Sequence, residues 1–320
     1  MNHRGARVRV AESLAVALMG LCAAAHGAVP EPVHYFSVTS SDGLPIAAME
    51  WGNRSGPPVL FVHGFGFASE FWNAQNTPAL NSQFHMVALD LRGHGASGKP
   101  WLASGYKDSQ LWADDIAAVL RAAAIERPTI VGWSLGGYVA MDYLRHYGVS
   151  SIAGLVLISS PAGFADRLSP SVPGYPLAAK QRASLSLADN IEGQRFVVRL
   201  MTAKPVPREV SDLWLAQALR LPVYVTTAMR GRSLDNRDLA DSLTVPTLFL
   251  LGSADTTMPF DALRAFAKSR PNVALRVYPG VGHALSYEGA TRFNAELAQF
   301  ILHNQLNSGS NHGRSENVAP

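Results

Sequence analysis

Residues 132–137 read GWSLGG and separate an apolar run, PTIV at 128–131, from a helix-like run, YVAMDYL at 138–144. A G-x-S-x-G turn between a strand and a helix strains the serine backbone and lifts its hydroxyl above the sheet edge. The glycines two positions before and after Ser134 let the strand and helix approach closely. The stretch therefore predicts a strand, a sharp turn and a helix, with Ser134 as a nucleophile.

A serine nucleophile needs a base to take its proton and an acid to orient that base. In chains with this turn, the acid and then the histidine follow the serine along the sequence. Asp255 ends the run LGSAD after one expected buried strand, and His283 ends the run PGVGH after the next. Alone, Asp255 also suits a turn and His283 a hydrogen-bonded loop. Because ligands collect at the carboxyl ends of parallel strands, we expect the three residues to act together.

The negative charge that develops on a carbonyl under attack needs two N–H donors. We expect the first to be the backbone N–H of Leu135, directly after the nucleophile. The second is expected from the loop HGFGF at 63–67, at the N–H of Phe65. His63 is interpreted as a brace for this loop rather than a catalytic group.

A further aspartate and histidine lie in the segment DLRGHGAS at 90–97, but both precede Ser134 and are in the wrong order for a triad. We expect Asp90 and Arg92 to hold a glycine-rich loop in place. The serine pair at 159–160 follows a strand without an adjacent acid. No cluster has metal-ligand spacing, so neither a metal site nor a cofactor is predicted.

Apolar, strand-like runs alternate with helix-like runs along most of the chain. The expected strands are 33–38, 46–51, 58–62, 84–89, 128–131, 152–158, 246–251 and 273–278, and the clearest expected helices are 108–124, 260–269 and 291–306. Continuous apolar strands are typical of a sheet that is buried on both faces. The pattern predicts an α/β fold with a doubly wound, mostly parallel eight-stranded sheet.

The alternation breaks between residues 163 and 241, where strand-like runs are scarce and helix-like runs are interleaved with proline. This predicts an inserted helical lid at 163–241, within a core formed by 28–162 and 242–306. Residues 307–320 are polar and are expected to form a disordered tail. A chain of 320 residues can fold as one α/β domain that carries such an insertion.

The N-terminus has the pattern of an export signal. Arginines stand at positions 4, 7 and 9, an apolar stretch spans 14–25, and small residues follow. We expect residues 1–27 to be a signal peptide and the protein to be exported, periplasmic or secreted. The alternative is an uncleaved N-terminus that anchors the protein in a membrane.

Removal of residues 1–27 would leave 24 basic and 23 acidic residues, a net charge of +1. The basic character of the whole chain therefore belongs mostly to the signal, and no nucleic-acid partner is expected. The single cysteine, Cys22, would leave with the signal. The mature chain is thus expected to have no disulfide and no reactive thiol.

These motifs together resemble the α/β-hydrolase superfamily over residues 33–306. Within it, the segment 221–229, which leads to 245–247, is similar to the arylesterase and cofactor-free haloperoxidase branch. Haloalkane dehalogenases and epoxide hydrolases carry aspartate where this chain has Ser134. The resemblance implies a cofactor-free serine hydrolase that cleaves a small-molecule carboxylic ester through an acyl-serine intermediate.

Three alternatives stay open: a cofactor-free perhydrolase or haloperoxidase, a C–C bond hydrolase of the same fold, and a ligand-binding receptor with little turnover. Aromatic residues at 67, 133 and 164 suggest an apolar pocket mouth, although aromatic side chains near a core more often serve packing. We expect Phe67, Trp133 and Phe164 to contact substrate. The acyl group, the leaving group and the oligomeric state are left open.

Overall fold

The computed structural model describes residues 33–168 and 172–312. The expected export signal and residues 313–320 lie outside this range. Eight strands form one sheet in the order β1-β2-β4-β3-β5-β6-β7-β8. Their bounds are β1 (His34–Thr39), β2 (Pro45–Gly52), β3 (Pro58–Val62), β4 (His85–Leu89), β5 (Thr129–Trp133), β6 (Gly154–Ile158), β7 (Thr247–Gly252) and β8 (Val273–Tyr278).

The sheet is mostly parallel. Only β2 runs against its neighbours, pairing antiparallel with β1 and β4, whereas every other neighbouring pair is parallel. The expected eight-stranded, doubly wound α/β fold is confirmed. The carboxyl ends of the parallel strands therefore meet at one edge, where loops after β3, β5, β7 and β8 come together.

Helices cover both faces of the sheet. On β3, Leu60 and Val62 pack into one cluster, while Val59 and Phe61 pack into the other. The first cluster includes residues of α4 (Ser109–Ala122), α5 (Leu135–Tyr147) and α10 (Phe260–Lys268), and the second includes residues of η1 (Ser69–Gln75), α2 (Pro78–Asn81), α11 (Leu285–Glu288) and α12 (Ala290–His312). Burial on both faces explains why the strands are continuous apolar runs.

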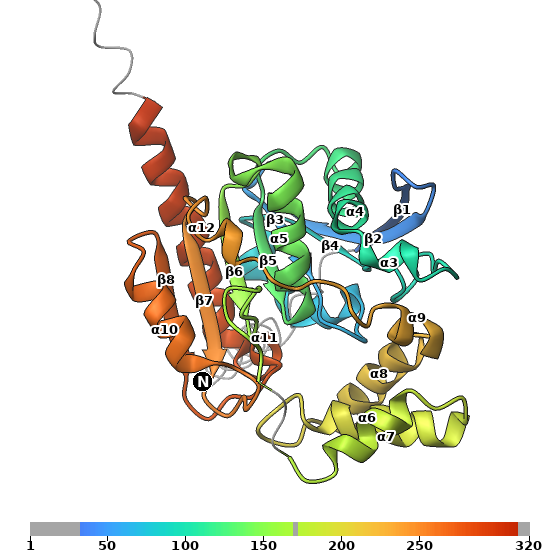
Figure 1. The fold of residues 1–320 in the computed structure, drawn as a ribbon. Coiled ribbons are helices and arrows are strands. Elements are labelled where there is room, and N and C mark those ends of the chain that lie inside the picture. Colours follow the sequence, from blue (N-terminus) through green and yellow to red (C-terminus); the bar gives the residue numbers. More distant parts are fainter. Residues whose placement is uncertain (1–32, 169–171, 313–320) are drawn as a thin grey trace, which may run out of the picture.

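Residues 163–241, called the insert below, connect β6 to β7. Their helices are α6 (Tyr175–Arg182), α7 (Leu187–Arg199), α8 (Arg208–Leu219), α9 (Val223–Ala228) and η3 (Arg237–Leu239), and no strand occurs in the described part of the insert. Figure 1 shows α6–α9 gathered at one end of the molecule. The two ends of the insert meet, because the Asn236 N–H donates to the Gly163 carbonyl at 3.2 Å.

The start of α4 and the end of α12 can be compared with the helix bounds expected from the sequence. Asp108, the first residue of the expected helix 108–124, is the N-cap of α4, since its side chain accepts from the Gln110 N–H. The last helix, α12, continues to His312 rather than ending at Leu306, so the start of the expected disordered tail is corrected. No proline interrupts residues 307–312, and extending an existing helix costs little. Among the described helices, none is long and apolar enough to cross a membrane.

Candidate active site

Ser134 lies in the sharp turn between β5 and α5. Its φ of 51° and ψ of −115° are uncommon for a residue that has a Cβ. The Ser134 N–H donates to the Ile158 carbonyl at 2.9 Å. A Cβ on Gly136 would lie 2.1 Å from the Val62 carbonyl oxygen, and one on Gly132 would lie 2.7 Å from the Gly136 oxygen. The turn therefore requires the glycines of the motif, and neighbouring elements hold the serine in its strained conformation.

Asp255 and His283 follow β7 and β8 at the same sheet edge. His283 Nδ1–H donates to Asp255 Oδ2 at 2.6 Å. Thr257 donates twice to Asp255 Oδ1, from its backbone N–H at 3.0 Å and from its hydroxyl at 2.7 Å. Burial alone would raise the pKa of Asp255, but the charge and hydrogen bond of His283, together with Thr257, lower it to about 2. Asp255 is therefore ionised near neutral pH and orients the imidazole.

Trp133 supports the backbone next to the imidazole. Its indole Nε1–H donates to the His283 carbonyl at 2.9 Å, a bond between residues 150 positions apart. The indole also stacks on Phe71, with centroids 3.9 Å apart and planes inclined by 5°. No local sequence pattern predicts this bond, because only the fold brings the two segments together.

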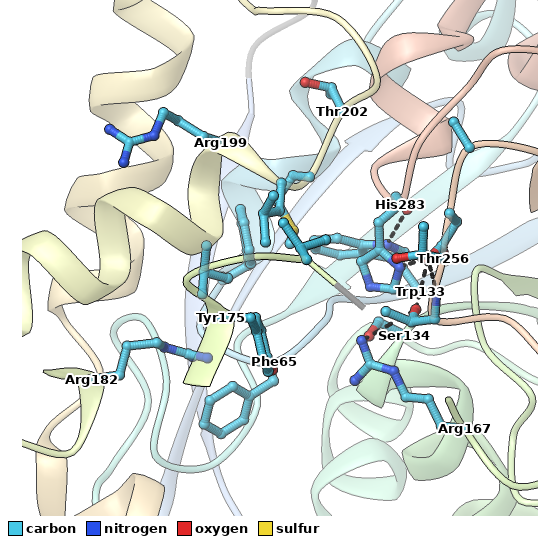
Figure 2. Close-up of a pocket in the computed structure, with 18 residues that line it drawn as sticks. Phe65, Trp133, Ser134, Arg167, Tyr175, Arg182, Arg199, Thr202, Thr256 and His283 are labelled. Atoms are coloured by element: carbon cyan, nitrogen blue, oxygen red, sulfur yellow. Dashed lines mark hydrogen bonds and ion pairs between the residues drawn. The ribbon is translucent and has the colours of Figure 1, made fainter. Parts of the chain in front are cut away.

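Ser134, Asp255 and His283 line one pocket (Figure 2). Across residues 33–168 and 172–312, no hydrogen bond joins the Ser134 hydroxyl to the imidazole. In free enzymes, such bonds are often long and shorten when substrate binds. The structure thus brings the three expected residues to one site, in which the Asp255–His283 bond is already formed.

Two backbone N–H groups next to Ser134 have no acceptor in the described part of the chain, those of Phe65 and Leu135. Phe65 lies in a turn closed by the Phe67 N–H, which donates to the Gly64 carbonyl at 3.2 Å. Leu135 begins α5, where the first N–H groups have no acceptor within the helix. A Cβ on Gly64 would lie 3.1 Å from the Ser134 Cβ, so this loop passes close to the serine. Unpaired backbone N–H groups are rare, and this pair suits an oxyanion.

Comparison with known proteins identifies the family. The family model described as alpha/beta hydrolase fold matches residues 57–290. The chain belongs to this α/β hydrolase family. It is 28% identical over 282 residues to the bifunctional esterase/perhydrolase DCH of Acinetobacter calcoaceticus, covering 82% of this chain and 98% of that protein. It is 27% identical over 278 residues to a non-heme chloroperoxidase of Burkholderia pyrrocinia, covering 82% and 98%.

A solved structure of an esterase is also similar to this chain. The esterase RhEst1 from Rhodococcus sp. ECU1013 superimposes with a TM-score of 0.74 at 28% identity, covering 83% of this chain and 98% of that chain. The relatives of this α/β hydrolase thus include esterases and non-heme haloperoxidases, in agreement with the resemblance seen in the motifs.

His63 braces the loop of this α/β hydrolase, as expected. Its Nδ1–H donates to the Gly64 carbonyl at 2.8 Å, and its Nε2 accepts from the Leu91 N–H at 3.0 Å. Burial lowers the pKa of His63, and its charged neighbours do not reverse that effect. The neutral imidazole therefore joins the loop after β3 to the loop after β4.

Asp90 and Arg92 also hold loops, as expected. The carboxylate of Asp90 accepts from the Ser69 N–H at 2.7 Å and from the Ala96 N–H at 2.6 Å. Arg92 makes two bonds of 2.7 Å to the Asp115 carboxylate. The charges of both residues are therefore engaged outside the pocket.

The expected substrate-contacting aromatic residues separate into two groups. Phe67 and Trp133 line the pocket. Phe164 does not, which corrects the expectation that it contacts substrate. Gly163, with a φ of +87°, turns the chain after β6, and Phe164 instead stacks on Phe266 of α10 with centroids 4.5 Å apart. Its ring is part of the core.

Several pocket residues were not predicted from the sequence. Thr257 bonds to Asp255 as described above, and three arginines of the insert, Arg167, Arg182 and Arg199, line the pocket. Periodicity does not indicate where insert side chains point, because the insert packs on the core through contacts that are distant in sequence. Within the described residues, no group of three or more His, Cys, Asp or Glu side chains could hold a metal ion.

Proposed function

We propose that this α/β hydrolase cleaves small carboxylic esters through an acyl-serine intermediate. The observation that carries the proposal is one pocket lined by a strained serine and a histidine bonded to a carboxylate, with two unpaired N–H groups beside the serine. Each feature has a separate task in acyl transfer, and the relatives named as esterases support the same chemistry.

In the first half-reaction, Ser134 Oγ attacks the ester carbonyl while His283 Nε2 takes its proton. The carbonyl oxygen becomes an oxyanion and accepts from the N–H groups of Phe65 and Leu135. Asp255 holds the imidazole tautomer and stabilises its positive charge. The intermediate collapses as the imidazolium gives its proton to the leaving alcohol, which leaves the acyl group on Ser134.

In the second half-reaction, His283 takes a proton from water, and the resulting hydroxide attacks the acyl-serine. The second oxyanion uses the same N–H groups, and its collapse returns the proton to Ser134 and releases a carboxylic acid. Hydrogen peroxide in place of water would give a peroxycarboxylic acid by the same proton transfers. The relative named as both esterase and perhydrolase supports this second candidate activity.

The test combines active-site labelling with transient kinetics. A fluorophosphonate should add to Ser134, as mapped by peptide mass spectrometry, and p-nitrophenyl acetate should give a burst of one nitrophenol per protein. Ser150→Ala, at an exposed serine outside the pocket, is the matched control and should behave like wild type. Ester binding with neither label nor burst would favour the receptor alternative. Turnover of a β-diketone without ester turnover would favour C–C hydrolysis.

We also propose that residues 1–27 export the protein. The basic residues at 4, 7 and 9 and the apolar stretch 14–25 support this proposal. N-terminal sequencing of protein from its native host should find a new terminus between Ala24 and Val29, outside the cytoplasm. An intact terminus in the membrane fraction would support the anchor instead, and an intact terminus on soluble cytoplasmic protein would contradict export.

A further inference from the structure

The pocket is lined by more positive than negative charge. Three arginines of the insert line the pocket. The only carboxylate among the lining residues is that of Asp255, which is hydrogen-bonded to His283. An apolar ester gains nothing from such a lining. The excess of positive charge therefore favours a ligand that carries a negative charge.

Arg182, at the end of α6, is the arginine most tightly built into the pocket. It is half-buried, and its Nε–H donates to the Gln194 side-chain oxygen at 2.9 Å. Its guanidinium carbon lies 5.3 Å from the centre of the Phe65 ring. Its Nη2 lies 3.8 Å from the position that a Cβ on Gly66 would take. The cation thus stands against the loop that carries one of the unpaired N–H groups.

The terminal nitrogens of Arg182 have no protein acceptor within the described residues. A guanidinium has five N–H donors, and the bond to Gln194 uses one of them. Burial lowers the pKa of Arg182, with Tyr175 opposing this effect and the charge of Arg167 adding to it. A partly buried cation without a counter-charge is unfavourable unless a ligand or water accepts its hydrogen bonds.

Arg92 shows what a structural arginine looks like in this protein. Its side chain bonds to Asp115 at 2.7 Å and to Asp42 at 3.1 Å. Burial alone would lower the pKa of Arg92, but the two aspartates raise it. The protein therefore supplies carboxylates where an arginine serves the fold, whereas Arg182 is left with an amide and an aromatic ring.

We propose that Arg182 binds a carboxylate at the far end of the acyl group, so that the preferred substrates are monoesters of dicarboxylic acids. This inference rests on the proposed ester hydrolysis. Arginine suits the role because its planar fork can donate two parallel hydrogen bonds to a carboxylate. The ring of Phe65 beneath the guanidinium would keep that fork in place.

The position of Arg182 favours the acyl side over the alcohol side. The leaving alcohol must lie beside His283, because the imidazolium protonates it. In Figure 2, Arg182 points towards Phe65 and lies across that residue from His283. A carboxylate bound there would extend away from the leaving group, along the remaining substituent of the carbonyl carbon.

The other two arginines play smaller parts. Arg167 is exposed, and its guanidinium is 3.5 Å from the Thr257 hydroxyl, so water and the protein already solvate it. In Figure 2, Arg199 points away from Ser134. Arg167 points towards Ser134 in Figure 2, but its charge is exposed to water, as is that of Arg199. Both would attract anionic esters rather than hold them.

The test compares monomethyl esters of C5 to C8 dicarboxylic acids with methyl esters of monocarboxylic acids of equal carbon number, at pH 7.5. The measured quantity is the ratio of kcat/KM for the charged ester to that for the neutral one. This ratio should exceed one in wild type and fall roughly 10- to 100-fold in Arg182→Gln. Arg182→Lys should retain part of the preference because it keeps the charge.

Arg208→Gln is the matched control, since Arg208 lies on α8 with an 89% exposed side chain and does not line the pocket. Its ratio should equal that of wild type, and circular dichroism should show that all variants are folded. An unchanged ratio in Arg182→Gln, or a wild-type preference for neutral esters, would overturn the inference while leaving ester hydrolysis standing. Absence of turnover of every ester, with Ser134 unlabelled by fluorophosphonate, would overturn the proposed function and this inference with it.

Discussion

The loops at the carboxyl edge of the sheet and the helices of the insert line the same pocket but treat charge differently. In the loops, charged side chains meet partners from the chain itself: His283 bonds to Asp255, and Arg92 bonds to Asp115. The insert also pairs charges, as in the Arg232–Asp142 ion pair, but Arg182, which lines the pocket, has no carboxylate partner within the described residues. The difference indicates separate roles for the two regions. The loops position the proposed reacting groups, and the substrate would supply the counter-charge for Arg182 of the insert.

The two regions also differ in how they are packed. Strand residues such as Val59 and Leu60 are completely buried, whereas Leu185 and Leu187 of the insert are 92% and 70% exposed. Positions that bury little surface tolerate substitution better than core positions. The sheet and its loops should therefore set the rate of the chemistry, and the insert should set the choice of ester.

The largest effect is expected from Ser134→Ala. Loss of the proposed nucleophile should lower kcat/KM by ~10⁴-fold or more, for neutral and carboxylate-bearing esters alike. The Ser134 hydroxyl makes no hydrogen bond within the described residues, so the unfolding temperature should stay close to that of wild type. Steady-state kinetics with both ester classes and a thermal melt measure this. A loss confined to one ester class would contradict the assignment of chemistry to the sheet.

Asp255→Asn should lower kcat by about 10⁴-fold, because an amide favours the wrong tautomer of His283. Asp166→Asn is the matched control at an exposed aspartate of the insert and should keep wild-type kinetics. A silent Asp255→Asn variant together with an impaired Asp166→Asn variant would place the acid in the insert.

The same substitution has a consequence for acid stability. The pKa of Asp255 is lowered from 3.8 to about 2 in the folded protein. Its stabilising contribution is therefore complete above about pH 4 and is lost as pH falls towards 2. Urea unfolding across this window should show a steeper loss of stability in wild type than in Asp255→Asn. Equal slopes would show that the Asp255–His283 bond does not stabilise the fold.

Trp133→Phe should have a moderate effect. The substitution keeps an aromatic ring but removes the hydrogen bond to the His283 carbonyl, so kcat should fall roughly three- to tenfold. A change in kcat with little change in KM would identify a positioning role. Trp101→Phe, at a 75% exposed tryptophan, is the control. An unaltered kcat in Trp133→Phe would mean that the loop after β8 positions His283 without this bond.

The smallest effect on overall rate is expected from replacing the insert. Exchange of residues 163–241 for the corresponding segment of a related esterase should keep Ser134 reactive towards fluorophosphonate. The ranking of esters by kcat/KM should change, by up to roughly tenfold between acyl groups, because loops above the strand ends contact the substrate. A well-folded chimera with an unchanged ranking would assign selectivity to Phe67 and Trp133 in the core pocket.

The agreement between sequence and structure follows from local rules. Strands that are buried on both faces appear as continuous apolar runs, and α4 begins at Ser109, directly after its N-cap Asp108, one residue from the expected start. The chain order of Ser134, Asp255 and His283 is equally readable, because each residue follows a recognisable strand. The expectation for Phe164 failed because it treated an aromatic residue near the sheet edge as pocket-facing, whereas the turn at Gly163 sends it into the core.

By itself, the sequence determined the order of strands and helices, the strained serine turn and the residue types at the strand ends. These depend on periodicity, glycine geometry and chain order, which are local properties. Only the tertiary structure decided that Trp133 supports His283 and that Arg182 lines the pocket with no carboxylate partner among the described residues. Both results depend on contacts between distant segments, and whether a charge is neutralised depends on which segments the fold brings beside it.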